Sequence, residues 1–313
     1  MTWQRRHVLA TDDWSREEIE QVLDQAGAMR EVLARPIRRT PALRGRTVIL
    51  FFAEASTRTR VSFELAAKAL SADVTTITAS GSSVEKGETL LDTVRTLTAL
   101  GGDVIVMRHA ASGAPYFVAE RTAAAVINAG DGWHAHPTQG LLDALTLRGA
   151  LGDLDGKRIV IVGDITHSRV ARSDIDTLLP LGATITLSGP PTLVPAAWRC
   201  GAAPRGVSFE PDLDRALDAA DAVIALRLQR ERQAAGLLPS IREYARTWGL
   251  SEERVARMRP GAPVLHPGPM NEGVEIDAAV AHGPRSLIET QVTNGVAVRM
   301  ALLYLLAGTG AAE

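Results

Sequence analysis

The sequence is short of cysteine and of long apolar runs, and each shortage excludes a class of protein. Cys200 is the only cysteine among 313 residues, so the chain cannot form an intrachain disulfide. No apolar run approaches the roughly 20 residues that span a bilayer. Residues 1–6 (MTWQRR) also lack the apolar core of a signal peptide. We therefore expect a cytoplasmic protein with no membrane partner.

Charge of one sign is not in excess, and lysine is scarce. The formal net charge is -2, which argues against a nucleic-acid partner because such proteins usually present a basic face. Arginine provides nearly all of the positive charge, and the only lysines are Lys68, Lys86 and Lys157. Lys86 is notable because it lies in a Gly- and Ser-rich segment, although a solvated loop charge is the simpler interpretation.

Short apolar runs alternate with helical patterns, which is typical of βα units with parallel strands. The expected strands are residues 47–53, 74–78, 104–107, 125–128, 158–163, 183–187, 222–226 and 263–265. A helix over 136–149 separates the two series, and a polar, Gly-containing stretch follows it. The sequence therefore predicts an α/β protein with two domains, 1–149 and 150–289, each a parallel sheet flanked by helices. A helix over 290–313 would pack back on the first domain.

Polar side chains follow the expected strands at their carboxyl ends, where open α/β sheets bind ligands. Arginines recur at these positions in both halves of the chain: Arg58, Arg108, Arg169 and Arg227. Histidines and small polar residues accompany them in 136-HPTQ-139 and 266-HPGP-269. Several arginines from separate strands indicate an anionic ligand with more than one anionic group.

The segment Ser56-Thr57-Arg58-Thr59 stands where a buried strand turns into a helix. Unpaired amides at a helix N-terminus, three hydroxyls and a guanidinium together suit a phosphate. The segment is not a P-loop, because G-x-x-x-x-G-K is absent. Taken alone, the segment has a simpler interpretation, in which Ser56 or Thr57 caps the helix and Arg58 and Arg60 are solvated.

Other familiar sites are absent from the sequence. The run 159-IVIVGD-164 resembles a dinucleotide fold, but G-x-G-x-x-G is missing, which excludes a nicotinamide cofactor. No group of His, Cys, Asp and Glu has metal-ligand spacing, so no metal or other cofactor is expected. Taken singly, Arg108 could be an ordinary surface residue and His136 a capping histidine.

The full set of motifs resembles the aspartate/ornithine carbamoyltransferase family. The matching segments, in family order, are 56-STRTRVSFE-64, 82-SSVEKGETLLDT-93, 107-MRH-109, 129-AGDGWHAHPTQGLLD-143, 162-VGDITHSRVARS-173, 226-LRLQRER-232 and 266-HPGPMNEGVEI-276. They extend over almost the whole chain. The resemblance implies a carbamoyl-phosphate domain, an acceptor domain, an active site in the cleft between them, and a homotrimer.

The resemblance also implies a role for each matching residue. The phosphate of carbamoyl phosphate would be bound by Ser56, Thr57, Arg58, Thr59 and Arg108. The carbamoyl group would be held by His136, Gln139 and the Gly268-Pro269 backbone. The acceptor's carboxylates would meet Arg169, Arg227 and Gln229. Ser82 and Lys86 would reach the neighbouring subunit's site, where Lys86 would contact the acceptor.

The chemistry implied is attack of an acceptor amine on the carbamoyl carbon with departure of phosphate. Arg58, Thr59, Arg108 and His136 would then stabilise charge that develops in the transition state. No side chain stands out as the base for the amine proton, and the substrate phosphate could accept it.

The motifs favour L-aspartate as the acceptor, because ornithine enzymes usually contain S-M-G and H-C-L-P segments that are missing here. Glu272 departs from the family pattern, in which arginine is frequent. The alternatives are a carbamoyltransferase acting on ornithine or an acylated amino acid, and an inactive paralogue that scaffolds a pyrimidine-pathway complex. Binding of regulatory chains or dihydroorotase to the trimer stays open.

Overall fold

Two parallel sheets organise the chain, whose computed structural model describes residues 3–78, 89–228 and 237–308. Contacts divide it into unit 1, Met1–Leu142 with Thr293–Glu313, and unit 2, Asp143–Val292. The two boundaries fall inside helices α5 (Pro137–Leu151) and α11 (Ile288–Ala307). Each unit is described below by itself.

The sheet of unit 1 has four parallel strands in the order β2-β1-β3-β4. The strands are β1 (Thr47–Phe52), β2 (Asp73–Thr78), β3 (Val104–His109) and β4 (Ala125–Asp131). Residues 48–52 are all buried, as expected for a parallel strand covered on both faces. The edge strand β2 differs, because none of its residues is buried.

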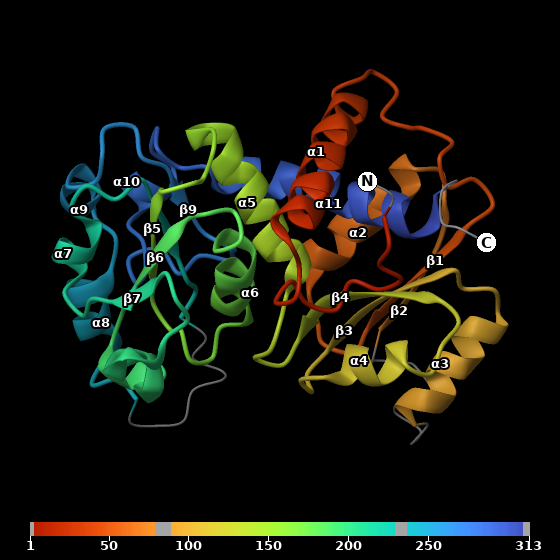
Figure 1. Ribbon diagram of the computed structural model, residues 1–313, viewed down its shortest axis with the longest axis horizontal. Coiled ribbons are helices and arrows are strands. Elements are labelled where there is room, and N and C mark those ends of the chain that lie inside the picture. Colours follow the sequence, from red (N-terminus) through yellow and green to blue (C-terminus); the bar gives the residue numbers. More distant parts are fainter. Residues whose placement is uncertain (1–2, 79–88, 229–236, 309–313) are drawn as a thin grey trace. The chain divides into compact units, whose positions relative to one another are not determined.

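Helices cover both faces of this sheet (Figure 1). They are α1 (Arg16–Leu33), α2 (Thr57–Ala69), α3 (Leu90–Ala99) and α4 (Ala114–Ala119), with most of α11. Val94 of α3 and Val118 of α4 belong to one core cluster with the alternating strand residues Ile49, Phe51 and Ile105. Figure 1 shows α1, α2 and α11 on the opposite side of the sheet.

The sheet of unit 2 has five parallel strands in the order β7-β6-β5-β8-β9. They are β5 (Arg158–Val162), β6 (Thr184–Ser188), β7 (Val207–Phe209), β8 (Ala222–Ala225) and β9 (Val264–Leu265). The helices are α6 (Arg169–Leu178), α7 (Leu213–Leu217), α8 (Ile241–Trp248), α9 (Glu252–Ala256) and α10 (Ala278–Ala281). Two short helical turns, Pro191–Leu193 and Trp198–Ala202, follow β6. Leu217, Val255 and Val280, from α7, α9 and α10, pack in one cluster with strand residues such as Val160 and Val223.

The predicted fold class, parallel sheets flanked by helices in two units, is confirmed. Each of the eight predicted strands is present within one to three residues of its predicted bounds. Strand β7 was not predicted. It has three residues, none of them buried, and its pattern is too short to distinguish from a loop.

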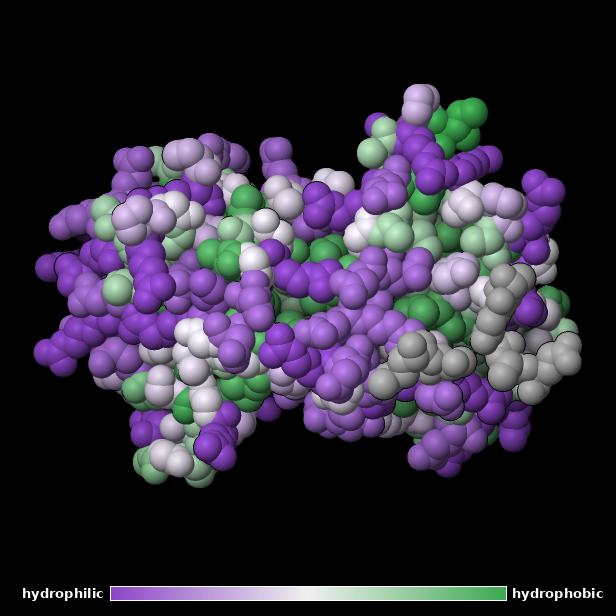
Figure 2. Space-filling model, turned by 45° about the horizontal axis from the view of Figure 1, so that its top comes forward, coloured by the Kyte–Doolittle hydropathy of each residue, from purple (hydrophilic) through white to green (hydrophobic). Residues whose placement is uncertain are grey.

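Exposed apolar residues are scattered over the described surface. On the face shown in Figure 2 they form small patches separated by hydrophilic residues. The large ones are Ile37, Val61, Leu65, Leu100, Phe117, Trp133 and Val292. Among the described residues, no helix combines the length and apolarity needed to cross a bilayer.

Candidate active site

In unit 1, the carboxyl ends of three strands meet at one edge of the sheet. Parallel pairing sets Phe52 of β1 beside Arg108 of β3, and Met107 of β3 beside Asn128 of β4. The segment after β1 continues this pairing, since the Ala53 amide donates to the Arg108 carbonyl at 2.9 Å. The predicted phosphate segment, Arg108 and the segment after β4 therefore share one edge.

Helix α2 begins at this edge, immediately after Ser56. Ser56 occupies the N-cap position, yet its side chain makes no capping hydrogen bond, and the first turn contains no acidic residue. The simple capping interpretation of Ser56 is therefore wrong. Thr57 and Arg58 are exposed, whereas Thr59 is buried. The helix N-terminus keeps its positive electrostatic character and presents a hydroxyl and a guanidinium at the surface.

Arg108 is held at the end of β3 with its guanidinium buried. Its Nη2 donates to Glu54 Oε1 at 2.6 Å, and its Nη1 donates to the Ala129 carbonyl at 3.2 Å. Only 9% of the residue is exposed, so the interpretation as an ordinary surface arginine is wrong. Glu54 stands two residues before the cap of α2, so this ion pair fixes Arg108 beside the phosphate segment.

His136 and Gln139 lie at the start of α5 and are both buried. The turn leading into them is organised by Asp131, a residue that the motif analysis did not single out. Asp131 accepts hydrogen bonds from the Asn128 amide group at 2.7 Å, the Gly113 N–H at 2.6 Å and the Ala135 N–H at 3.1 Å. Its position at the end of an expected strand, in 129-AGDGWHA-135, is the sequence feature that could have identified Asp131 as a site residue.

Asp131 is fully buried, yet its pKa is lowered and not raised. Burial alone would raise its pKa, but hydrogen bonds from His134, Asn128 and Gly113 outweigh burial and hold the pKa below its usual value. A buried carboxylate with this many donors is a rigid anchor. It fixes the segment that delivers His136 to the edge of the sheet.

In unit 2, Arg169 is the first residue of α6 and is 3% exposed. Ser168 caps this helix by accepting from the Ala171 N–H at 3.1 Å. Asp164 binds the turn before the cap, because it accepts from the His167 N–H at 3.1 Å and lies 2.9 Å from His167 Nδ1. The turn after β5 therefore holds Arg169 in a defined position.

The neighbouring strands of unit 2 bring Arg227 and the 266–269 segment to the same edge. Val162 of β5 pairs with Ala225 of β8, and Ile224 pairs with Leu265 of β9. Arg227 follows β8 and is half-buried. Asn271 Nδ2 donates to the Leu228 carbonyl at 3.5 Å, which links the two segments.

A buried histidine shapes the Gly268-Pro269 turn, whose peptide bond is cis. His266 Nδ1 accepts from the Gly268 N–H at 2.8 Å, which leaves the proton on Nε2, 3.2 Å from Glu275 Oε1. Glu275 also accepts from the Asn271 N–H at 2.6 Å. His266 and Glu275 are each 1% exposed, so the backbone that is predicted to face the carbamoyl group rests on a buried polar network.

Three predicted site residues, Ser82, Lys86 and Gln229, lie outside the described residues. Glu272 is described: it is exposed, and its Oε1 lies 3.1 Å from His282 Nε2. Within residues 3–78, 89–228 and 237–308, no group of three or more His, Cys, Asp or Glu could hold a metal ion.

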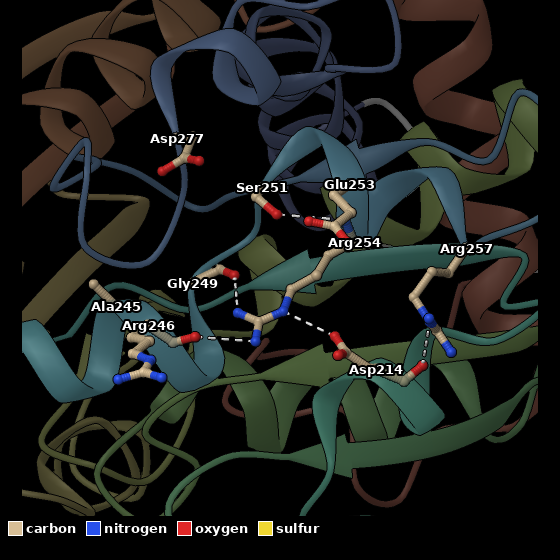
Figure 3. Close-up of a pocket in the computed structure, with 9 residues that line it drawn as sticks. All are labelled: Asp214, Ala245, Arg246, Gly249, Ser251, Glu253, Arg254, Arg257 and Asp277. Atoms are coloured by element: carbon tan, nitrogen blue, oxygen red, sulfur yellow. Dashed lines mark hydrogen bonds and ion pairs between the residues drawn. The ribbon is translucent and has the colours of Figure 1, made fainter.

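A surface pocket of about 310 Å³ in unit 2 contains three arginines but none of the predicted site residues (Figure 3). Arg254 donates to Asp214 Oδ1 at 2.9 Å and to the carbonyls of Gly249 and Arg246 at 2.8 and 3.0 Å. Arg257 donates to the Asp214 carbonyl at 3.1 Å. These bonds join α7, α8 and α9, so we interpret this pocket as a product of helix packing.

Comparison with known proteins agrees with this arrangement. The model of the carbamoyl-phosphate-binding domain of aspartate/ornithine carbamoyltransferases matches residues 6–149, and the model of the Asp/Orn-binding domain matches residues 155–306. The chain belongs to the aspartate/ornithine carbamoyltransferase family.

Relatives in the carbamoyltransferase family resemble this chain over nearly its full length. The aspartate carbamoyltransferase catalytic subunit of Chloroflexus aurantiacus is 59% identical over 309 residues, covering 98% of this chain and 100% of that protein. The subunit of the same name from Anaeromyxobacter sp. is 55% identical over 314 residues, with 100% and 99% coverage.

Solved carbamoyltransferases share the fold. Aspartate transcarbamoylase from Trypanosoma cruzi, in complex with N-(phosphonacetyl)-L-aspartic acid, has a TM-score of 0.87 and 30% identity, covering 98% of this chain and 97% of that one. Ornithine carbamoyltransferase from Pyrococcus furiosus also has a TM-score of 0.87, with 28% identity and 99% coverage of both chains. The fold alone therefore does not distinguish the two acceptors.

Proposed function

We propose that this chain is an aspartate carbamoyltransferase. It transfers the carbamoyl group of carbamoyl phosphate to the amino group of L-aspartate and releases N-carbamoyl-L-aspartate and phosphate. This reaction is an early committed step of de novo pyrimidine biosynthesis, and we place the enzyme in the cytoplasm. The observation that supports the acceptor most directly is the 59% identity to an aspartate carbamoyltransferase catalytic subunit over 98% of the chain.

We assign carbamoyl phosphate to the edge of unit 1. Its phosphate binds at the start of α2, and we assign its donors to Ser56, Thr57, Arg58, Thr59 and Arg108. The buried ion pair with Glu54 at 2.6 Å supports a fixed position for Arg108. The carbamoyl group lies against His136 and Gln139 at the start of α5.

The neutral amine of aspartate attacks the carbamoyl carbon, a C–N bond forms, and the C–O bond to phosphate breaks. Negative charge develops on the carbonyl oxygen, and donors from His136, Arg108 and Thr59 stabilise it. Arg58 offsets the charge that grows on the departing phosphate, which accepts the amine proton. Orientation of two bound substrates supplies much of the remaining rate enhancement.

We assign the two carboxylates of aspartate to the edge of unit 2. Arg169 and Arg227 bind them, and Gln229 and the neighbour's Lys86 complete the acceptor site. The buried, capped start of α6 supports a rigid position for Arg169. Two arginines suit a dicarboxylate, whereas ornithine has one carboxylate and a second amine.

An assay with alternative acceptors tests this proposal. The purified chain, given carbamoyl phosphate, is expected to release phosphate with L-aspartate and to leave L-ornithine and N-acetyl-L-ornithine unused. Formation of N-carbamoyl-L-aspartate, identified by mass, is the matched product measurement. Equal or faster turnover with ornithine would show that aspartate is not the preferred acceptor. No turnover with any of these amines would indicate a non-catalytic scaffold.

We further propose that the enzyme works as a homotrimer in which Ser82 and Lys86 enter the neighbour's site. Exposed apolar residues support a partner surface on unit 1: Val61 and Leu65 lie one turn apart on α2 and are 38% and 53% exposed. Strand β2, which immediately precedes the 79–88 segment, also has no buried residue. A second copy of the chain would cover such surfaces.

Hybrid trimers test the shared site. Lys86→Ala and Arg169→Ala trimers should each be nearly inactive. If both are dissociated, mixed equally and reassembled, a working site needs one intact residue from each parent. Random mixing then restores about a quarter of the sites. Verified hybrids as inactive as their parents would show that Lys86 acts within its own chain.

A further inference from the structure

Helix α11 contains one deeply buried charge. Its 20 residues include only two charged side chains, Glu289 near the start and Arg299 in the second half. Arg299 is 4% exposed and is surrounded by apolar neighbours on its own helix, such as Val298 and Met300, which are fully buried. A buried guanidinium is costly to desolvate, so its hydrogen-bond partners decide what it contributes.

The Arg299 guanidinium bridges two helices that begin at the predicted carbamoyl-phosphate site. Its Nη1 donates to Ser62 Oγ of α2 at 2.7 Å. Its Nη2 donates to Thr138 Oγ1 of α5, in a longer hydrogen bond of 3.4 Å. The guanidinium carbon also lies 5.1 Å from the centre of the Phe63 ring. All of these residues belong to unit 1.

Both partners stand close to the residues assigned to the substrate. Ser62 lies one helical turn after Arg58 and three residues after Thr59, on the same helix. Thr138 is fully buried and lies between His136 and Gln139. The Arg299 side chain therefore connects the first turns of α2, which contain residues assigned to the phosphate, to the first turn of α5, which contains residues assigned to the carbamoyl group.

The helix leaves room for this side chain. A Cβ added at Gly295, four residues before Arg299, would lie 2.6 Å from Arg299 Nη1 and 3.2 Å from Leu142 Cδ2. Any larger residue at 295 would displace the guanidinium from the position that reaches Ser62. Gly295 thus gives a way to move the Arg299 guanidinium without removing any polar group.

We propose that Arg299 is a positioning residue for carbamoyl phosphate. It fixes the separation of the first turns of α2 and α5, so that the phosphate donors and the carbamoyl donors act on one substrate. A planar fork can serve two hydroxyls at once, whereas a lysine ammonium at the same place is a compact point charge on a flexible stem. The inference rests on the proposed function, because it takes the ligand of this edge to be carbamoyl phosphate.

The test compares wild type with Arg299→Met, Arg299→Lys, Ser62→Ala and Gly295→Ala. Misplacement of reacting groups by about 1 Å can cost on the order of 10²-fold in rate. Arg299→Met should therefore lower kcat about 10²-fold and raise the KM for carbamoyl phosphate. Arg299→Lys should recover part of this loss, and Gly295→Ala should reproduce it in part. The KM for aspartate should change least.

Arg285→Met is the matched control. Arg285 is a partly buried arginine of unit 2 whose Nη1 donates to the Val255 carbonyl at 2.7 Å, and neither residue is assigned to the site. The Arg285→Met substitution should lower the melting temperature, because it removes a hydrogen bond that stabilises unit 2. It should leave kcat and both KM values within about twofold of wild type, because it does not alter the site.

A titration with inorganic phosphate supplies a readout that does not need turnover. Wild type should bind phosphate. Arg299→Met should bind it about tenfold more weakly, because the donors at the start of α2 lose their alignment; a tenfold loss corresponds to about 1.4 kcal/mol. If wild type binds phosphate but does not carbamoylate aspartate, the proposed function fails while this inference is still judged by the titration.

The inference is overturned if Arg299→Met keeps wild-type phosphate affinity and kcat per folded chain. Should Arg299→Met fail to fold, Ser62→Ala and Gly295→Ala decide the matter. Unchanged phosphate affinity in both of these variants would leave Arg299 a structural residue only. The inference would also be overturned if the wild-type protein did not bind phosphate at all.

Discussion

Asp174→Asn should stabilise unit 2, and the gain should grow as the pH rises. Asp174 and Asp143 are both fully buried. Burial first, then the charge of Asp143 and a hydrogen bond to it, raise the pKa of Asp174 well above its usual value. Gln291 Nε2 donates to Asp143 Oδ1 at 2.6 Å, and the raised pKa places the proton of this carboxyl pair on Asp174.

The magnitude follows from proton linkage. Between the usual pKa and the raised pKa, the folded chain keeps a proton on Asp174 that the unfolded chain has released. The free energy of unfolding therefore falls as pH rises, by about 1.4 kcal/mol per pH unit in that window. An asparagine amide can donate to Asp143 at every pH, so the substitution should remove this slope.

Urea unfolding at pH 5, 6, 7 and 8, monitored by tryptophan fluorescence, measures the unfolding free energy of both proteins. Trp198 and Trp248 report on unit 2. The difference between Asp174→Asn and wild type should increase with pH until the raised pKa is passed. Glu253→Gln, at an exposed position of α9, is the matched control and should show no such trend. A difference that is constant with pH, or that falls, would refute a protonated Asp174.

Three further predictions concern the assigned site. Arg58→Lys should be severely impaired, because an ammonium cannot replace a bidentate fork, and His136→Ala should lower turnover by on the order of 10²-fold; near-wild-type turnover in both folded variants would remove these assignments. Arg169→Ala and Arg227→Ala should weaken aspartate binding and leave carbamoyl phosphate binding nearly intact in calorimetry, and a loss of carbamoyl phosphate affinity in either would contradict the division between the units. His266→Ala should cost about 1–3 kcal/mol in unfolding free energy, because it removes one partner of the buried Glu275 carboxylate and leaves the Gly268 N–H without its acceptor, and an unchanged urea midpoint would contradict that role.

The strands were predictable because burial on both faces imposes continuous apolar runs. Residues 48–52 are all buried, and the run Val-Ile-Leu-Phe-Phe reads directly as such a strand. Strand β7 shows the limit of this signal, since Val207-Ser208-Phe209 is short and has no buried residue. Only its pairing with β6, a contact between segments separated in sequence, makes it a strand.

The position of the candidate site residues at strand ends was predictable for a related reason, because parallel strands bring their carboxyl ends to one edge. The residues that hold them in place were harder to predict. Asp131 and Glu54 read as ordinary acidic loop residues, and Arg299 as one charge in an apolar helix. Their roles depend on partners that are remote in sequence, such as Ser62 for Arg299 at 2.7 Å. The roles of all the candidate site residues stay predictions, and Ser82, Lys86 and Gln229 also lie outside the described residues.

Calorimetric titration with N-(phosphonacetyl)-L-aspartate tests the central claim most directly, because this one molecule combines a phosphonate with the aspartate dicarboxylate. The account predicts that wild type binds it far more tightly than phosphate or aspartate alone. Arg58→Ala and Arg169→Ala should each weaken binding by roughly 10- to 100-fold, the loss expected for a charged hydrogen-bonded contact. Arg58→Ala should retain its affinity for aspartate, and Arg169→Ala its affinity for phosphate. Wild-type affinity no greater than that for phosphate, or unchanged affinity in either variant, would contradict the account.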